Sequence, residues 1–381
     1  MWPPSGPLVS TPEDISQYIT DTRTVLSKKL FATKDFEEFW RVLESVKVFS
    51  IYVIKVVSLQ TDPGNPDDIF RLWELIMSAA MSQFNRPDWI MDRTHDYLVN
   101  LVLWTREFDV QCRVVNPPTL FSNVAPPLYP NWDAYGFGYR MRRFIEYGMS
   151  NQRISSHLEG QKLRCLAAFS AKCFAHGLCP IDLGMAAMMN LKLALERLEL
   201  NMPQSAVNIT TTQKMLLPSA LAWIQHSQHR MLSLSMDCTF STGAGAEIFE
   251  SYSPDIGLAK TTKTVDGFAD LPPGFNVARW IHWRQVVYIL AQNPDPDIAI
   301  QGRKAWIHMI NCGREMGYDV PGEEFYFGMI QKSMEEARRA TKPDSVWVKS
   351  MSDINADFYW AGIDQILLYL RGPPKTRRGI D

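Results

Sequence analysis

The chain has 381 residues, of which 46% are hydrophobic and 21% charged, and its formal net charge is -2. This composition provides for a large core and excludes a wholly disordered chain. Proteins that grip phosphate backbones usually show a basic excess or a basic stripe, and neither is present, so we expect no nucleic-acid partner. We also expect no membrane span, because no run of about 18 consecutive apolar residues occurs.

The six cysteines are interpreted as reduced thiols. No CxxC pair occurs, and the closest spacing, Cys173 to Cys179, suits neither a zinc site nor a redox pair. The first residues show neither the basic region nor the apolar region of a secretory signal. Both observations predict a cytoplasmic location.

Four helices are predicted in the first third of the chain. Thr11 is an N-cap followed by proline at the first helical position, and Asp35 opens the second helix. The turn at 62–66 precedes the third helix, and the fourth begins at about Asp88. The proline-rich connector at 116–130 then marks the best internal boundary of this half.

The middle of the chain is its most apolar part. As helices, the segments 160–176 and 180–200 are apolar on nearly every side, which predicts two central helices buried in a core. The methionines of the second segment are interpreted as core filler. A further helix is predicted at 215–232, with Pro218 in its first turn.

A long irregular loop rich in Ser, Thr and Gly is predicted at 233–273. It is too long for a plain connector, which indicates a lid, a binding loop or a flexible insertion. A flexible tail is predicted at 371–381. Between the loop and the tail, four helices are expected at about 276–292, 296–316, 323–340 and 353–370.

These elements together predict an all-α fold. We expect a single large multi-helix orthogonal bundle in which residues 1–381 form one helical domain, with a sub-boundary at the 116–130 connector left open. No internal repeat at a fixed period is found.

No sequence motif for a cofactor is found, so none is predicted. The chain has no GxxxxGK[ST] phosphate loop, no GxSxG elbow, no HExxH pair and no EF-hand loop. His226 and His229 are spaced i, i+3 and could reach one metal ion, but both fall on the polar face of their predicted helix. A solvated or interface face is therefore favoured there over a metal site.

The stretch GFNVARWIHWRQVVYIL, from Gly274 to Leu290, combines aromatic and basic residues on one predicted helix. Trp280 and Trp283 lie on one apolar stripe, which we interpret mainly as packing. Arg279 falls inside the apolar arc. Because a guanidinium stays charged, it must find a carboxylate, backbone carbonyls or a ligand anion there.

A second aromatic group lies just after the connector, in the stretch NWDAYGFGYRMRRF. Its members Trp132, Tyr135, Phe137 and Tyr139 are interleaved with arginines. Such residues can stack on nucleic-acid bases, but the neighbouring acids and the overall charge argue against that partner. Tyrosine hydroxyls and arginines at the edge of an apolar cavity also describe a small-molecule pocket.

Five segments carry a family pattern in a fixed order, namely Trp132 with Asp133, 169–177, 194–196, 218–224 and 274–283. In this order they resemble a fungal family of unknown function over roughly residues 88–316. The resemblance implies an ascomycete origin and an all-helical fold, and it brings no established activity. The chain departs from the family around Met188, where members usually carry Leu-Trp or Ile-Trp.

The first functional hypothesis is a cofactor-free enzyme of fungal secondary metabolism, most concretely a pericyclase of the Diels–Alder type. Its substrate would be a hydrophobic terpenoid or polyketide intermediate, most simply a carboxylic acid. Such a reaction needs a cavity that holds both ends of the substrate and a donor that polarises a carbonyl or carboxylate. The predicted catalytic residues are Arg279, which would bind the carboxylate, and Tyr135. The predicted substrate-binding residues are Trp132, Phe137, Tyr139, Trp223, Trp280, Trp283 and Tyr288.

The alternative hypothesis is a non-catalytic helical scaffold or protein-interaction protein. In that case the aromatic residues are core, and Arg279 pairs with a core carboxylate such as Asp182 or Glu196. A closed apolar cavity beside Arg279 would favour the enzyme, and a solid core there would favour the scaffold. The sequence leaves homo-oligomerisation open under either hypothesis.

Overall fold

The computed structural model describes most of the chain as far as Tyr318. The two helices predicted after that residue, the 371–381 tail and nearly all of the 233–273 loop fall outside the described residues. The described residues are 12–59, 66–115, 136–149, 156–196, 198–201, 206–238, 274–318, 320, 323 and 328.

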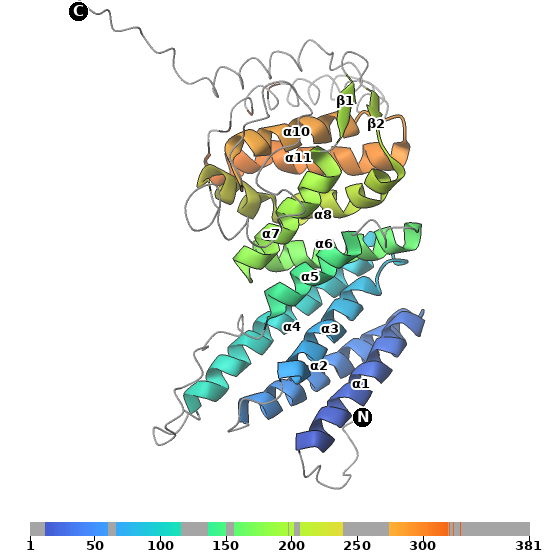
Figure 1. The fold of residues 1–381 in the computed structure, drawn as a ribbon, viewed down its shortest axis with the longest axis vertical. Coiled ribbons are helices and arrows are strands. Elements are labelled where there is room, and N and C mark those ends of the chain that lie inside the picture. The colour runs from blue at the N-terminus through green and yellow to red at the C-terminus, as the bar shows by residue number, and fades with distance from the viewer. Residues whose placement is uncertain are drawn as a thin grey trace, which may run out of the picture. The chain divides into compact units, whose positions relative to one another are not determined.

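The fold is all-α, as predicted (Figure 1). The chain divides into two compact units, unit 1 (Met1–Leu183) and unit 2 (Gly184–Asp381). The division falls inside helix α7 (Pro180–Leu191) and not at the 116–130 connector. That the whole chain forms one domain stays a prediction. Within the described ranges, no helix is long and apolar enough to cross a membrane.

Unit 1 is a two-layer stack of helical hairpins in its described part. Helix α1 contacts α3, which contacts α5, and in the second layer α2 contacts α4, which contacts α6. Each pair of consecutive helices, α1 with α2, α3 with α4 and α5 with α6, is also in contact. These helices are α1 (Pro12–Ala32), α2 (Phe36–Leu59), α3 (Pro66–Met81), α4 (Asp88–Val115), α5 (Phe137–Met149) and α6 (His157–Ala175).

Local sequence explains how these helices begin and where the core of unit 1 lies. Helix α1 begins at Pro12, the residue expected at the first helical position. Ser156 caps α6 by accepting a hydrogen bond from the backbone N–H of Glu159. In the core, the rings of Trp73 and Phe137 meet edge to face with centroids 5.0 Å apart.

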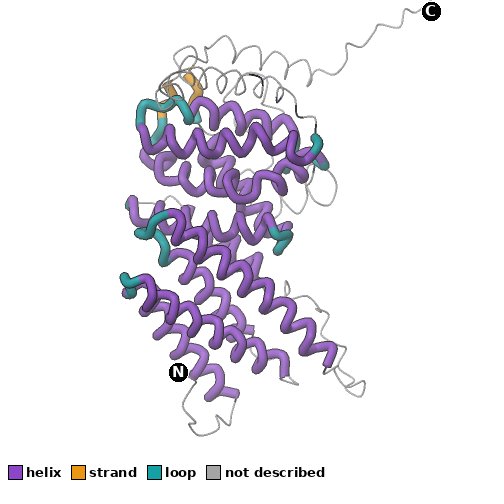
Figure 2. Tube along the Cα trace, turned by 180° about the vertical axis from the view of Figure 1, so that it is seen from behind, coloured by secondary structure: helices purple, strands orange, loops and turns teal. Residues whose placement is uncertain are grey.

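Unit 2 is a helical bundle with one small hairpin, drawn in orange in Figure 2. Strands β1 and β2 are antiparallel, with Leu200 opposite Val207. Helix α8 contacts both α10 and α11, and α10 also contacts α11. After α7, the elements are the π-helical turn η2 (Lys192–Glu196), β1 (Glu199–Asn201), β2 (Ala206–Asn208), α8 (Thr211–Met236), α10 (Val277–Leu290) and α11 (Pro296–Met316).

Three predicted boundaries in unit 2 were wrong. The helix expected over 180–200 ends its α-helical part at Leu191 and continues as η2 and then as β1. Helix α8 begins at Thr211 and not at about 215, because Thr210 and Gln213 form a reciprocal capping box. It also runs to Met236, into the start of the expected loop, and Pro218 lies inside the helix.

The interpretation of the apolar middle of the chain is confirmed. Helix α6 is buried along most of its length, from Leu163 to Phe174. The methionines Met185, Met188 and Met189 of α7 are all buried core residues. They therefore fill space between helices, as the adaptable methionine side chain often does.

Candidate functional site

Helix α10 carries the residues on which both functional hypotheses depend. It begins at an N-cap, Asn276, whose side chain accepts the backbone N–H of Arg279. This places Arg279 at the third helical position, next to the chain segment that enters the helix. Every residue from Ala278 to Leu290 is buried, so the polar side chains of this helix face protein and not solvent.

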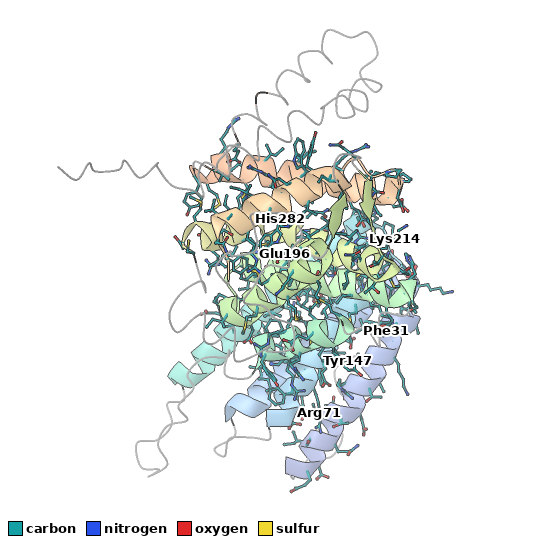
Figure 3. The ribbon with its side chains drawn as sticks, turned by 45° about the horizontal axis from the view of Figure 1, so that its top comes forward. Phe31, Arg71, Tyr147, Glu196, Lys214 and His282 are labelled. Atoms are coloured by element: carbon teal, nitrogen blue, oxygen red, sulfur yellow. The ribbon has the colours of Figure 1, made fainter. Side chains whose placement is uncertain are left out.

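The partner of Arg279 is supplied by η2, the π-helical turn that follows α7. Glu196 is the last residue of this turn, and its side chain is only 1% exposed. Turns of this kind are rare and widen the helix locally, which re-aims the side chains at its end. Figure 3 labels Glu196 and His282, which lie close together within unit 2.

Arg279 and Glu196 form a buried two-point ion pair. The Nε of Arg279 donates to Oε1 of Glu196 at 2.7 Å, and its NH2 group donates to Oε2 at 3.2 Å. The NH1 group donates to the carbonyl oxygen of Gly274 at 2.9 Å. Gly274 has a φ of 78°, a left-handed conformation that glycine adopts without strain and that presents this carbonyl.

Glu196 is itself held by a second donor from α10. The indole Nε1 of Trp283, one helical turn after Arg279, donates to the same Oε1 at 2.9 Å. Trp283 in turn packs edge to face on Phe275, with ring centroids 6.2 Å apart. The carboxylate thus meets three N–H groups from two residues, which is the environment that a buried charge requires.

Of the partners considered for Arg279, the structure shows the internal carboxylate of Glu196. The other candidate, Asp182, instead lies 3.2 Å from the NH1 group of Arg142 in unit 1. Each nitrogen of the guanidinium already has an acceptor, and its charge is compensated by Glu196, so an added anion would compete with that carboxylate for Arg279.

His282 is a buried titratable group beside this pair. Burial lowers the pKa of its imidazole below the usual value, and the nearby Glu196 carboxylate only partly opposes this effect. The positive charge of Arg279 lowers the pKa further. His282 is therefore held in its neutral form, and it adds no charge to the core.

The predicted aromatic residues are distributed over both units and the residues outside the described ranges. Trp132 and Tyr135 lie outside the described residues. Phe137 and Tyr139 belong to unit 1, where Phe137 is fully buried against α3 while Tyr139 is 47% exposed. The remaining predicted residues are buried in unit 2, namely Trp223, Trp280, Trp283 and Tyr288.

Two buried donors on α10 lack partners among the described residues. They are the indole Nε1 of Trp280 and the amide Nε2 of Gln285. A buried donor of this kind commonly meets an ordered water molecule or a ligand. Trp280 was a predicted substrate-binding residue, so this is the observation in unit 2 that favours a bound polar group.

A second buried carboxyl group in unit 2 was not foreseen from the sequence. Glu323 is 6% exposed and accepts the backbone N–H of Gly313 at 3.0 Å. Burial raises the pKa of this carboxyl, and the charge of Arg284 on α10 opposes the rise. Gly313 has no side chain that would block this approach. Glycine followed ten residues later by an acid is a weak signal, so sequence alone could not have found the contact.

The two histidines considered for metal binding lie on α8. His229 reaches across to α11, where its Nε2 lies 2.6 Å from Glu315, and both side chains are about half exposed. This agrees with the interface face favoured from the sequence. Among the described residues, no group of three His, Cys, Asp or Glu side chains could hold a metal ion.

Comparison with known proteins identifies a family but no characterised relative. Neither the curated proteins nor the solved structures yield a match to the chain. The family described as protein of unknown function (DUF3632) matches residues 73–286, more than half of the chain. This range includes more than half of unit 1, all of η2 and most of α10. The chain therefore belongs to the DUF3632 family.

Proposed function

We propose that this protein is a non-catalytic helical scaffold that works by binding other proteins. The observation that carries the proposal is the closed ion pair between Arg279 and Glu196. The enzyme hypothesis needs Arg279 as an anion-binding group, and that group is already occupied by a carboxylate of the same unit.

The energetics of the pair support this choice. Removing one member of a buried pair leaves an uncompensated charge, which typically costs about 3–5 kcal/mol. A substrate acid that displaced Glu196 would leave that carboxylate buried without its arginine partner. A ligand that had to break this pair on binding would bind unfavourably. The same high cost of breaking the pair suits a structural contact that fixes how η2 packs on α10.

The architecture of unit 1 also supports a scaffold. Stacked helical hairpins present long, regular surfaces, and proteins built from such stacks commonly bind extended partners along them. The stack from α1 to α6 exposes several large hydrophobic side chains. Those above 40% exposure on α1, α2 and α4 are Val25, Phe31, Val48 and Trp89.

The second candidate function is the cofactor-free cyclase of fungal secondary metabolism, which stays a prediction. The fungal origin of the protein, a hydrophobic substrate and a homo-oligomeric state also stay predictions. The observation in its favour is the buried indole N–H of Trp280, for which the described residues offer no acceptor. A substrate carbonyl could take that hydrogen bond. In this case Trp280, and not Arg279, would orient the ligand.

Native mass spectrometry separates the two functions. The protein is incubated with a panel of long-chain fatty acids and with the matching methyl esters, which lack the charge. A scaffold retains neither, because Arg279 is occupied. Retention of an acid by the wild-type chain, lost in a folded Arg279→Lys variant, would overturn the proposal. Retention of acid and ester alike, lost in Trp280→Phe, would support the cyclase instead.

A further inference from the structure

A row of aromatic side chains lies at the surface of unit 1, along the seam between α2 and α4. The aromatic row consists of Phe36 and Trp40 on α2 and Trp89 and Tyr97 on α4. Phe36 meets Trp40 at 5.7 Å and Trp89 at 5.9 Å, and Trp40 meets Tyr97 at 5.4 Å between ring centroids. The rings touch edge to face or tilted, so the row is preformed.

The aromatic row remains open to solvent. Trp89 is 60% exposed, and Phe36, Trp40 and Tyr97 are half-buried. The indole N–H groups of Trp40 and Trp89 have no hydrogen-bond acceptor among the described residues. The row therefore offers both apolar faces and unused donors.

The same face of α4 continues beyond the row. Trp89, Arg93, Tyr97 and Trp104 follow one another at spacings of four, four and seven residues, which keeps them on one side of a helix. The helical rise separates Trp89 from Tyr97 by about 12 Å and Tyr97 from Trp104 by about 10 Å. A polyproline II helix repeats every three residues, or about 9 Å. One turn of such a ligand is thus nearly as long as the distance between successive aromatic side chains on this face of α4.

One cation beside the aromatic row has no internal ion pair. Arg93 lies above the ring of Trp40, 5.3 Å from its centroid, and it has no carboxylate partner among the described residues. Several neighbouring charged side chains are paired within the protein, namely Arg41 with Glu37, Lys47 with Glu44, and Lys172 with both Asp92 and Asp96.

We infer that the aromatic row with Arg93 binds a proline-rich peptide segment of a partner protein that carries an acidic residue. Proline rings would pack on the exposed aromatic faces, and the carbonyls of the polyproline II backbone, which has no internal hydrogen bonds, would accept the indole N–H groups. The acidic side chain would pair with Arg93. The inference rests on the proposed scaffold function and assigns a partner chemistry to it.

A polyproline II ligand fits these features better than a helical one. The carbonyls of an α-helix are already bonded within the helix, so a helical partner would leave the indole donors of Trp40 and Trp89 unused. A helical ligand also calls for a continuous apolar groove. Here Glu37 and Arg41 lie on the outer side of α2 beside the row and are both largely exposed.

Fluorescence polarisation with the full chain tests the inference. The probes are a labelled polyproline decapeptide with one central glutamate, the same peptide with glutamine, and a charge-matched helical peptide. We expect saturable binding of the glutamate peptide, weaker binding of the glutamine peptide and none of the helical peptide. Trp89→Ala should weaken the glutamate peptide at least about tenfold, because exposed aromatic anchors dominate such interfaces.

Two matched variants make the result specific. Arg93→Gln should weaken the glutamate peptide to the level of the glutamine peptide and leave the latter unchanged. Phe31→Ala, an exposed aromatic on α1 labelled in Figure 3, should change neither. Absence of binding, or binding that is unaffected by Trp89→Ala, would overturn the inference. Those outcomes would leave the scaffold function standing, since that proposal fails only if the mass-spectrometric experiment shows a retained ligand.

Discussion

The two units use the same pair of residue types in opposite ways. In unit 1, Arg93 lies over the ring of Trp40 at the surface. In unit 2, Arg279 and Trp283 both donate to the buried carboxylate of Glu196. An arginine beside a tryptophan can therefore serve recognition or packing, and the presence of an internal carboxylate decides between them. The difference teaches that burial and pairing, rather than composition, separate a binding surface from a structural core.

The largest effect on stability is expected from substituting Arg279, the buried arginine of this comparison. Arg279→Met should lower the free energy of unfolding by about 3–5 kcal/mol, because Glu196 stays buried without its main partner. Arg93→Met should change it by less than about 0.5 kcal/mol, as is usual for surface substitutions. Urea denaturation of both variants checks the prediction. Small and equal changes in the free energy of unfolding would show that Arg279 contributes no more to stability than the surface residue Arg93.

Much of the fold could be predicted from the sequence, because periodicity and caps are local signals. The N-cap of α10 at Asn276 and the proline opening α1 fall where such residues are expected. The capping box of Thr210 and Gln213 is also a local signal, and it places the start of α8 before Pro218.

The candidate site was only half predictable. The apolar surroundings of Arg279 required a partner, and Glu196 was one of the acids considered for it. Its selection over Asp182 depends on η2, whose winding no local pattern indicates. The contact between Glu323 and Gly313 likewise depends on tertiary packing. Long-range pairing of this kind leaves little trace in one sequence.

A smaller effect is expected where α10 meets α11. A Cβ atom at Gly302 would lie 2.7 Å from the backbone nitrogen of Ala291. Gly302→Ala should therefore destabilise the protein by about 1–3 kcal/mol, as overpacking usually does. Ile300→Ala, at an exposed position of the same helix, is the control. If Gly302→Ala lowered the unfolding temperature no more than the control, the close approach of α11 to Ala291 would be contradicted.

The smallest effect concerns the pH dependence of stability that is due to the buried His282. The unfolded chain takes up a proton on His282 near pH 6.5, whereas the folded chain resists protonation because burial lowers this pKa. The stability due to neutral His282 is thus complete above about pH 6.5 and declines as the pH falls below it.

Thermal unfolding measured from pH 8 to pH 5 can isolate the stability that neutral His282 contributes. The wild-type protein should lose more stability on acidification than His282→Asn, which carries no titrating group at that position. Parallel curves for wild type and His282→Asn would contradict the assignment of a buried neutral histidine.

The most direct test of the account is a double-mutant cycle on the ion pair, with Arg279→Met, Glu196→Leu and the double variant measured by urea unfolding. If the pair is an internal structural contact, each single change is costly and the double variant recovers much of the loss, giving a coupling of at least about 2 kcal/mol. Additive single effects, with a coupling within about 0.5 kcal/mol of zero, would show that Arg279 does not depend on Glu196 and would contradict the account.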